Sequence, residues 1–274
     1  ITNIGGHLMK TINFEALSAF DFSIKYLEMQ PGESPPVDQH IHSECEIYFN
    51  LSGDVSFMAG DNVYPVSRGS VIITRPYEYH HCIYRSNALH RHYWVLFSSE
   101  HNEKFLDIFF DRAAGEGNLI VLSPENTDRL AALFDSLLYE ELSSSERYIA
   151  FFEVMGILNS GAKKDSQKMA LSPEVTHALG EINKNFSGPF PLASLAESLH
   201  ISVNTLERHF KSRLGISPRE YLFQRRMSHA VSLLAGGKSV TVAAQESGFS
   251  DCSHFIAQFK KKFGTTPAKY KKGL

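Results

Sequence analysis

The sequence predicts an α+β protein of two domains, in which a β-rich N-terminal domain with appended helices precedes an all-helical C-terminal domain. The chain has 274 residues, which suits two domains of ordinary size. Apolar residues form short, closely spaced runs up to residue 97 and recur at helical spacing after residue 123. Charge divides in the same way, because residues 1–171 carry 13 Lys and Arg against 23 Asp and Glu, whereas residues 172–274 carry 14 against 7. A basic domain beside an acidic one predicts that the C-terminal domain binds a polyanion.

Composition argues against several other classes of protein. The chain is 43% hydrophobic and 21% charged, which is typical of a globular protein and not of a disordered one. No apolar run approaches the roughly 18 residues that span a bilayer, and the chain does not begin with an export signal. The three cysteines form no Cys-x-x-Cys pair, which argues against a disulfide framework or a cysteine zinc site. We therefore expect a cytoplasmic protein that does not enter a membrane.

The first domain is expected to span residues 9–159. Residues 1–8 precede the first methionine and share no pattern with the residues after it, so we interpret them as a non-native remnant outside the fold. From there to residue 97, runs rich in β-branched and aromatic residues alternate with turn signals such as Pro31-Gly32 and Gly60-Asp61. Strands at such close spacing predict a sandwich or a small barrel. The strand-like runs include 46–51, 55–58, 71–74 and 92–97.

Two helices are expected between residues 123 and 159. Ser123 is an N-cap candidate for the first, and the second covers residues 146–158. In the first helix, leucine and phenylalanine recur at steps of three and four residues: Leu130, Leu133, Phe134, Leu137 and Leu138. These helices either cover the β-domain or pair two protomers, and we expect a homodimer through them. The polar segment 160–171 is then expected to be an interdomain linker.

The C-terminal domain, residues 172–274, contains an internal repeat. Residues 49 positions apart match, among them Leu206 with Phe255, Phe210 with Phe259, Gly215 with Gly264, Pro218 with Pro267 and Tyr221 with Tyr270. Each copy predicts a short helix, a tight turn and a second helix that ends at Gly215 or Gly264. A long helix from Pro218 to about Leu234 joins the copies. The domain is thus expected to contain two helix-turn-helix units.

Motifs across this domain resemble the DNA-binding signature of AraC/XylS-type transcription regulators. The matching positions include Leu206-x-Arg208-x-Phe210-Lys211, Gly215-x-Ser217-Pro218, Gly248-Phe249-Ser250-Asp251 and Phe259-Lys260-Lys261. The resemblance implies two recognition helices that enter successive major-groove segments of double-stranded DNA. Residues 9–159 are then expected to be the effector-binding and dimerisation domain of such a regulator.

The DNA contacts follow from which residues face outward when Leu206 and Phe210 face the core. In the first unit these are Asn204, Thr205, Glu207, Arg208 and Lys211, whose chemistry suits base edges. In the second unit, Ser253, His254 and Gln258 are candidate contacts, and Lys260 and Lys261 are candidate phosphate ligands. Arg208 reads a base or, alternatively, touches phosphate, and the lysines could simply form a solvated face. The family frequently has an arginine where this chain has Ala257, so the second unit is poorer in base contacts.

The β-domain resembles a cupin barrel. His40-Ile41-His42, Glu46 and Gly53 have the spacing of the first cupin motif, and Gly69, Pro76 and His81 approximate the second. The resemblance implies a cupin-like β-barrel that senses an effector. His40, His42, Glu46 and His81 could bind a divalent transition metal. Alternatively the same residues, with His92, line a polar pocket that hydrogen-bonds an organic effector, while His80 and His90 are further possible ligands.

Together these observations predict a transcriptional regulator, not an enzyme. We expect sequence-specific binding of double-stranded DNA, control by a small-molecule effector such as a sugar or related metabolite, and RNA polymerase as a further partner. The alternative is a metal-dependent cupin enzyme with an appended DNA-binding domain. No cofactor is required by the sequence beyond the candidate divalent metal.

Overall fold

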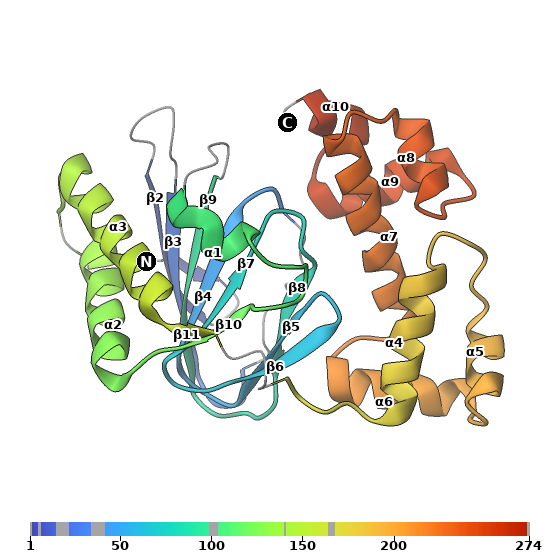
Figure 1. The fold of residues 1–274 in the computed structure, drawn as a ribbon, viewed down its shortest axis with the longest axis horizontal. Helices are drawn as coiled ribbons and strands as arrows, with labels where there is room; N and C mark the ends of the chain where they lie inside the picture. The colour runs from blue at the N-terminus through green and yellow to red at the C-terminus, as the bar shows by residue number, and fades with distance from the viewer. Residues whose placement is uncertain are drawn as a thin grey trace. The chain divides into compact units, whose positions relative to one another are not determined.

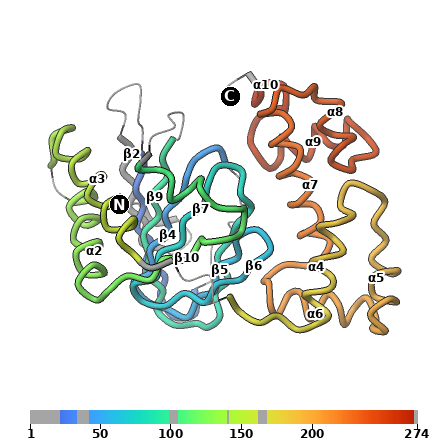
Figure 2. The backbone as a smooth tube through the Cα atoms, in the orientation of Figure 1, coloured from blue at the N-terminus to red at the C-terminus, as the bar shows by residue number. Residues whose placement is uncertain are grey.

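The computed structural model describes residues 2–4, 7–14, 22–33, 42–98, 104–139, 141–163 and 168–272. The chain divides into two compact units, Ile1–Met169 and Ala170–Leu274. Figure 1 shows that the first unit combines sheets with helices and that the second is helical, and Figure 2 traces the same path as a tube. The predicted α+β class, with a β-rich N-terminal and a helical C-terminal part, is confirmed.

Antiparallel strands of the first unit form two sheets. Within the described residues, the larger sheet has eight strands in the order β1-β2-β3-β9-β4-β7-β10-β11, and the smaller has three in the order β6-β5-β8. The domain is therefore built from two sheets that pack face to face instead of one closed sheet. The strands are β1 (Thr2–Ile4), β2 (His7–Phe14), β3 (Phe22–Met29), β4 (Cys45–Ser52), β5 (Val55–Ala59), β6 (Asn62–Val66), β7 (Ser70–Thr74), β8 (His80–Tyr84), β9 (His90–Phe97), β10 (Leu119–Val121) and β11 (Ala162–Lys163).

The start of the chain belongs to the larger sheet. Thr2–Ile4 pairs with β2, and β2 pairs with β3 from Leu8 to Phe14. The expectation that residues 1–8 lie outside the fold is therefore wrong for the described part of that segment. The backbone hydrogen bonds of an edge strand require no apolar pattern, so the sequence carried no signal for this pairing.

Side-chain alternation along β4 separates the two faces of the larger sheet. Ile47 and Phe49 belong to a core cluster that also includes the helices, whereas Tyr48 belongs to the cluster shared with the smaller sheet. Glu46 and Asn50 lie two residues to either side of Tyr48 and so share its face. The polar residues of β4 are thereby placed between the sheets.

Helices cover the other face of the larger sheet. After a short turn, η1 (Lys104–Leu106) and α1 (Asp107–Phe110), come α2 (Pro124–Tyr139) and α3 (Ser144–Ser160), which Figure 1 shows against the larger sheet. Leu130, Phe134 and Leu137 of α2 are at most 2% exposed and pack into that core. In α3, the Ser143 hydroxyl accepts from the Glu146 backbone N–H and the Glu146 carboxylate accepts from Ser143, which forms a capping box. Most apolar residues of α2 therefore serve as a cover for the sheet.

The segment predicted to be a linker, 160–171, contacts the rest of the first unit at three places in its described part. Ala162 and Lys163 form β11 on the edge of β10. The Met169 backbone N–H donates to the carbonyl oxygen of Val63 on β6 at 2.7 Å, and the Ser56 hydroxyl donates to the Met169 sulfur at 3.1 Å. Lys168 also forms an ion pair with Glu116. The described parts of this segment are therefore docked on strand edges rather than extended through solvent.

Seven helices are described in the second unit. They are α4 (Pro173–Asn185), α5 (Leu192–Ser198), α6 (Val203–Leu214), α7 (Pro218–Ala235), α8 (Val240–Glu246), α9 (Cys252–Phe263) and α10 (Pro267–Lys272). Ser202, Ser217, Ser239 and Asp251 cap the N-termini of α6, α7, α8 and α9 with their side chains. Both α6 and α9 end at a glycine with positive φ, Gly215 and Gly264, as predicted.

The two copies of the repeat are offset by 49 residues in their second helices but by 48 residues in the turns that precede them. The second helices align at the predicted offset of 49, because the N-caps Ser202 and Asp251 are equivalent. The turns after the first helices align at 48 instead: Ile201 donates to the Ala196 carbonyl as Phe249 donates to that of Ala244. His200 and Gly248 are therefore equivalent, and both have positive φ, at 56° and 84°. The second turn has one more residue before its N-cap.

Among the described helices, none is both long enough and apolar enough to cross a bilayer.

Candidate effector site and nucleic-acid interface

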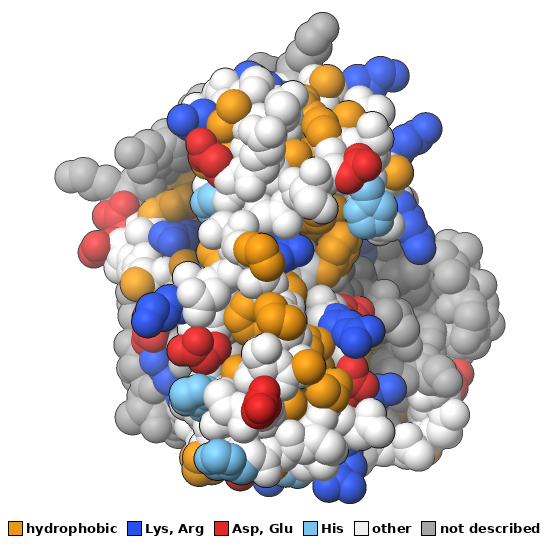
Figure 3. All heavy atoms as spheres, turned by 90° about the vertical axis from the view of Figure 1, so that its right-hand side faces the viewer, with side chains coloured by type: hydrophobic (Ala, Val, Ile, Leu, Met, Phe, Trp, Pro, Cys, Tyr) orange, Lys and Arg blue, Asp and Glu red, His pale blue; other side chains and the backbone are white. Residues whose placement is uncertain are grey.

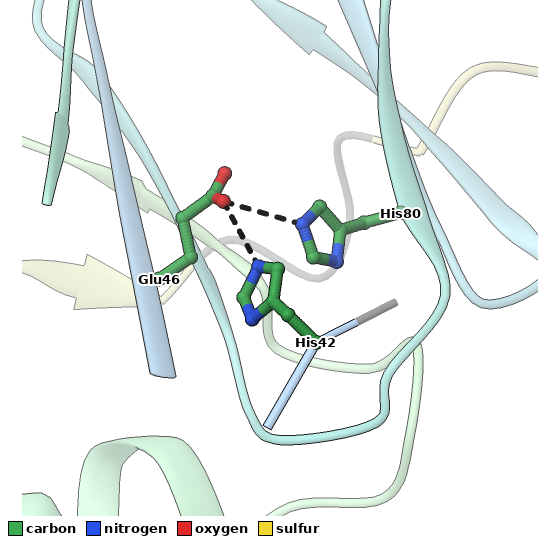
Figure 4. Close-up of side chains that lie close together, drawn as sticks. All are labelled: His42, Glu46 and His80. Carbon is green, nitrogen blue, oxygen red and sulfur yellow. Dashed lines mark hydrogen bonds and ion pairs between the residues drawn. The ribbon is translucent and has the colours of Figure 1, made fainter. Parts of the chain in front are cut away.

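Two histidines and a glutamate meet between the sheets. His42 precedes β4, Glu46 lies on β4 and His80 begins β8, and one ligand atom from each lies within 4.8 Å of the others. The Glu46 Oε2 atom is 3.2 Å from His42 Nε2 and 3.3 Å from His80 Nε2. Figure 4 draws both contacts as dashed lines. Glu46 and His80 are buried and His42 is half-buried. The structure thus brings together two of the predicted metal ligands, His42 and Glu46.

The third side chain of this cluster is His80 and not the predicted His81. Successive residues of a strand point to opposite faces, and β8 pairs with β5 so that His80 lies opposite Ala59 and His81 opposite Met58. The His80 ring stacks on Phe57, which lies in the cluster between the sheets, with ring centroids 5.9 Å apart. His81 points to the other face, where its ring lies 5.5 Å from that of Tyr79. The remaining predicted ligand, His40, lies outside the described residues.

Backbone carbonyls determine the tautomers of both histidines. His80 Nδ1 is 2.7 Å from the carbonyl oxygen of Glu78, and His42 Nδ1 is 3.0 Å from that of Glu44. A carbonyl oxygen only accepts hydrogen bonds, so each Nδ1 carries the ring proton and each neutral ring presents a lone pair at Nε2. Both lone pairs face a carboxylate oxygen, which also only accepts. Three acceptors that converge in this way are stabilised by a positive charge between them, either a proton on an imidazole or a metal cation.

A buried ion pair supports the turn that precedes His80. The Arg112 Nη2 atom lies 2.6 Å from Glu78 Oε2, and the Gly115 backbone N–H donates to Glu78 Oε1 at 2.6 Å. Burial alone would raise the pKa of Glu78, but the hydrogen bond and charge of Arg112 hold it below its usual value. Tyr77, next to Glu78, has a φ of 63° and donates its N–H to the His42 carbonyl. Sequence reasoning missed Arg112 because 34 residues separate it from Glu78.

Other buried polar groups lie on the same face. His92 is opposite Asn50 in the β4–β9 ladder, and its ring contacts Tyr48 and Trp94 at centroid distances of 4.7 and 4.3 Å. Neither His92 ring nitrogen has a hydrogen-bond partner in the part of the chain that the structure describes, and the same holds for Asn50 Nδ2 and Thr74 Oγ1. Buried polar atoms usually have partners, so these atoms are suited to bind a polar ligand or water. Asn50 and Thr74 were not predicted, although strand alternation from Glu46 could have found Asn50.

The exposed face of α6 carries the predicted DNA contacts. Asn204, Arg208 and Lys211 are exposed, Thr205 and Glu207 are half-buried, and Leu206 and Phe210 are fully buried. The Thr205 hydroxyl lies 2.9 Å from that of the N-cap Ser202. Figure 3 shows Lys and Arg side chains on the surface of this half of the molecule. The outward residues of α6 thus match those predicted from the helical period.

The equivalent face of α9 presents different chemistry. Ser253, His254, Lys260 and Lys261 are exposed, and Gln258 is half-buried. The Gln258 amide lies 3.3 Å from the His254 ring, which ties the two side chains together. Phe255 and Phe259 face the core. The basic residues gather in the last turn of α9, where a cation also interacts favourably with the helix dipole.

Two family models match the chain. The model described as "AraC-like ligand binding domain" matches residues 32–151, and the one described as "Helix-turn-helix domain" matches residues 195–273. The two matches fall in the first and second units, respectively.

The chain is also similar to individual proteins and solved structures. The HTH-type transcriptional regulator YfiF of Bacillus subtilis (strain 168) is 24% identical over 246 residues, which cover 85% of this chain and 78% of YfiF. The virulence regulon transcriptional activator VirF of Yersinia enterocolitica is 24% identical over 240 residues, which cover 83% of this chain and 89% of VirF. A crystal structure of a transcriptional regulator with an AraC-type DNA-binding domain from Chromobacterium violaceum is 30% identical, covers 36% of this chain and 90% of that chain, and has a TM-score of 0.34.

The burial of His92 predicts a loss of stability in mild acid. Burial lowers the pKa of His92 to about 3, whereas an unfolded histidine titrates near 6.5. As the pH falls below about 6.5, His92 is protonated in the unfolded chain but stays neutral in the folded chain, so the folded state loses stability relative to the unfolded state. At about pH 5 this costs on the order of 2 kcal/mol relative to pH 7, and His92→Phe should remove that part of the loss. Urea unfolding of both proteins at the two pH values measures it; an equal loss in both would assign the acid sensitivity to other groups.

Proposed function

Because this chain belongs to the AraC family of transcriptional regulators, with a ligand-binding N-terminal domain and a helix-turn-helix DNA-binding domain, we propose that it binds DNA through both α6 and α9. A small molecule held between the two sheets controls that binding. The observation that carries the proposal is the outward face of α6. There an asparagine, a glutamate and an arginine lie on one capped helix whose opposite face is buried. These side chains can distinguish adenine, cytosine and guanine in the major groove.

In this proposal the two recognition helices have different roles, base recognition by α6 and phosphate binding by α9. Arg208 on α6 has two donors for a guanine edge, and its equivalent on α9 at the offset of 49 is Ala257, which has none. On α9, Lys260 and Lys261 offer charges to phosphates, while Ser253, His254 and Gln258 offer weaker base contacts. We therefore assign most sequence discrimination to α6 and most of the nonspecific attraction at the second site to α9.

Two substitutions test this division. Arg208→Ala should relax specificity at one base pair, with a loss of roughly 1–3 kcal/mol of discrimination. Lys260→Ala should weaken binding to all sequences almost equally and lower the slope of log affinity against log salt by about 1. Titrations of labelled duplexes that differ at single positions, at several salt concentrations, measure both effects. A uniform loss from Arg208→Ala together with a base-specific loss from Lys260→Ala would contradict the assignment.

We propose the space between the sheets as the effector site, with His42, Glu46 and His80 at one end and His92 at the other. The polar atoms of His92, Asn50 and Thr74 that have no partner in the described chain would hydrogen-bond the ligand, and Trp94 and Tyr48 would supply apolar contacts. Such a lining suits a small molecule with several polar groups, such as a sugar or a related metabolite.

A divalent transition metal is part of the same proposal. Two imidazole nitrogens and a carboxylate oxygen are ligands that such metals prefer, and the carbonyls of Glu44 and Glu78 orient the two rings by accepting their Nδ1 protons. His42, Glu46 and His80 would hold the ion. When bound, it would supply a positive centre for an oxygen of the effector.

His80 and His81 provide a matched pair of variants for the metal. His80→Ala should abolish the rise in melting temperature that Zn²⁺ or Ni²⁺ produces in the full-length protein, whereas His81→Ala should keep it. The reason is that a ligand binding only the folded state stabilises it, by about 2.7 kcal/mol at a concentration of 100 times its dissociation constant. Thermal melts with and without each ion, with chelator as a blank, measure the effect. Equal stabilisation of the wild type and His80→Ala would move the metal site elsewhere.

We also propose a homodimer, with its interface on the outer face of α3. Of the apolar residues predicted on the first of the two helices, α2, Leu137 is buried within its own unit and Leu133 is half-buried. Ile149 and Phe152 are the better candidates, because they lie one turn apart on α3 and are 65% and 51% exposed. A dimer would double the length of DNA that is read.

Charged residues at these two positions test the interface. The double variant Ile149→Glu and Phe152→Glu should be a folded monomer that binds single sites but loses tight binding to paired sites, since a buried unpaired charge opposes association. Ala132→Glu, which adds the same charge at an exposed position of α2, is the control and should remain a dimer. Light scattering gives the mass of each. A dimer that survives the double substitution would place the interface on another surface.

A metal-dependent enzyme with an appended DNA-binding domain is the second candidate function. One observation favours it: two histidines and one carboxylate are also the iron ligands of a class of oxygenases. The relatives of this chain are transcriptional regulators, and we propose that it is a regulator without catalytic activity. We further propose that it acts in the cytoplasm, where DNA and RNA polymerase are its partners.

A further inference from the structure

We infer that the two helix-turn-helix units are held at one separation by a junction between them, in which Arg226 and Gly248 are the positioning residues. The junction consists of residues 186–188 in the α4–α5 connection, Arg226 and His229 on α7, and residues 247 and 248 in the turn between α8 and α9. This inference rests on the proposed function, in which α6 and α9 both contact DNA. It adds that the operator spacing is set by the junction as well as by the length of α7.

Helix α7 alone does not determine how the second unit is oriented. Its 18 residues span about 27 Å, which is less than the roughly 34 Å between major-groove segments one turn apart. It ends at Gly236 and Gly237, both exposed, and Gly237 has a φ of 84°. Glycines permit many backbone conformations, so this connection does not by itself fix the orientation of the helices that follow. Packing of α8 and α10 on α7, the bonds from Lys271 to the Gly237 and Lys238 carbonyl oxygens, and the contacts described next hold them.

Arg226 supplies a contact in the middle of α7. Its Nε donates to the Phe186 carbonyl oxygen at 2.7 Å, and its Nη2 donates to the Gly188 carbonyl oxygen at 2.8 Å. The planar guanidinium holds both carbonyls in one geometry, which the single ammonium of a lysine cannot reproduce. The α4–α5 connection is thereby attached to the linker helix at a fixed place.

Gly248 brings the turn of the second unit against Phe186, Ser187 and Arg226. A Cβ atom at position 248 would lie 2.8 Å from the Phe186 carbonyl oxygen, 2.9 Å from that of Ser187 and 3.0 Å from Arg226 Nε. The two distances to carbonyl oxygens are shorter than a carbon atom tolerates, and backbone oxygens cannot move aside as a side chain could. The second unit can therefore approach this closely only because residue 248 has no side chain.

The first unit provides an internal comparison. His200 occupies the equivalent place in its turn, also with positive φ, and its side chain is exposed. A residue with a Cβ is thus compatible with this turn of a helix-turn-helix unit. Close approach of the 186–188 segment, and not φ alone, explains why the second turn has a glycine.

Two further contacts close the junction. His229 on α7 lies with its Nδ1 atom 3.1 Å from the hydroxyl oxygen of Ser247, which is fully buried. The His229 ring also meets the Phe186 ring edge-on, with centroids 5.1 Å apart. The α4–α5 connection, α7 and the α8–α9 turn are therefore packed on one another. A unit held at three points has one orientation relative to its neighbour.

A rigid junction implies a strict spacing requirement on DNA. One inserted base pair moves the second contacted segment by about 3.4 Å along the axis and by roughly a tenth of a turn around it. A fixed pair of recognition helices cannot follow that change. A loosened pair can follow it, but it binds the correct spacing less well because it is no longer preorganised.

The experiment compares spacing preference in the full-length protein. Duplexes bound by the wild type are selected from a random pool, footprinting locates the two contacted segments, and one base pair is then inserted between them. The wild type should lose at least about tenfold in affinity on insertion, comparable to a mismatched base pair. Arg226→Lys, which keeps the charge, and Gly248→Ala should each bind the selected site about tenfold more weakly and lose less than about threefold on insertion. His200→Ala is the matched control and should behave as the wild type.

Each result decides the inference. If Arg226→Lys, folded by circular dichroism and thermal melting, keeps both the affinity and the insertion penalty of the wild type, the junction does not position the units. If His200→Ala flattens the spacing preference as much as Gly248→Ala, the effect belongs to these turns in general and the inference also fails. Should Gly248→Ala not fold, Arg226→Lys alone decides. A wild-type footprint that covers a single segment would instead refute the proposed two-unit binding, which is distinguishable from failure of the junction.

Discussion

The larger sheet must bury both of its faces, and the N-terminal unit is organised around that constraint. One face packs on α2 and α3 with apolar side chains such as Ile47, Phe49 and Val95. The other packs on the smaller sheet, yet it carries Glu46, Asn50 and His92 among its aromatic rings. Because strand residues alternate, polar residues on this face cannot reach solvent without exposing the apolar set. Burying such groups is unfavourable unless they find partners, which is the physical reason that we propose the space between the sheets as a binding site.

The helical unit is organised around a different constraint, the positions and orientations of α6 and α9 relative to one another. Side-chain N-caps and glycine C-caps determine where α6 and α9 begin and end. Apolar residues at one-turn intervals, Leu206 with Phe210 and Phe255 with Phe259, determine which face of each helix is buried. The faces that remain outside differ in chemistry, so the two copies of the repeat share a fold but present different surfaces.

Contacts connect the space between the sheets with the segment that leads out of the first unit. The carbonyl of Glu78 orients His80, the Glu78 carboxylate accepts from the Gly115 backbone N–H, and the neighbouring Glu116 pairs with Lys168. Met169 is meanwhile bonded to β6, the edge strand of the smaller sheet. These contacts form a continuous path in space, which does not by itself transmit a signal. A ligand can act through it only by binding more tightly to one of two arrangements of these groups.

The sequence by itself determined the order of the domains, the two helix-turn-helix units and the outward residues of α6, because all of these depend on local periodicity, caps and a repeat. It also brought His42 and Glu46 to one site. Only the tertiary structure decided between His80 and His81, since the facing residue depends on how β8 pairs with a distant strand. The same holds for Leu137, whose burial depends on the sheet beneath α2, and for Gly248, whose necessity comes from carbonyl oxygens about 60 residues earlier in the chain. Local patterns show which residues can face a core or a ligand, whereas long-range packing decides which of them do.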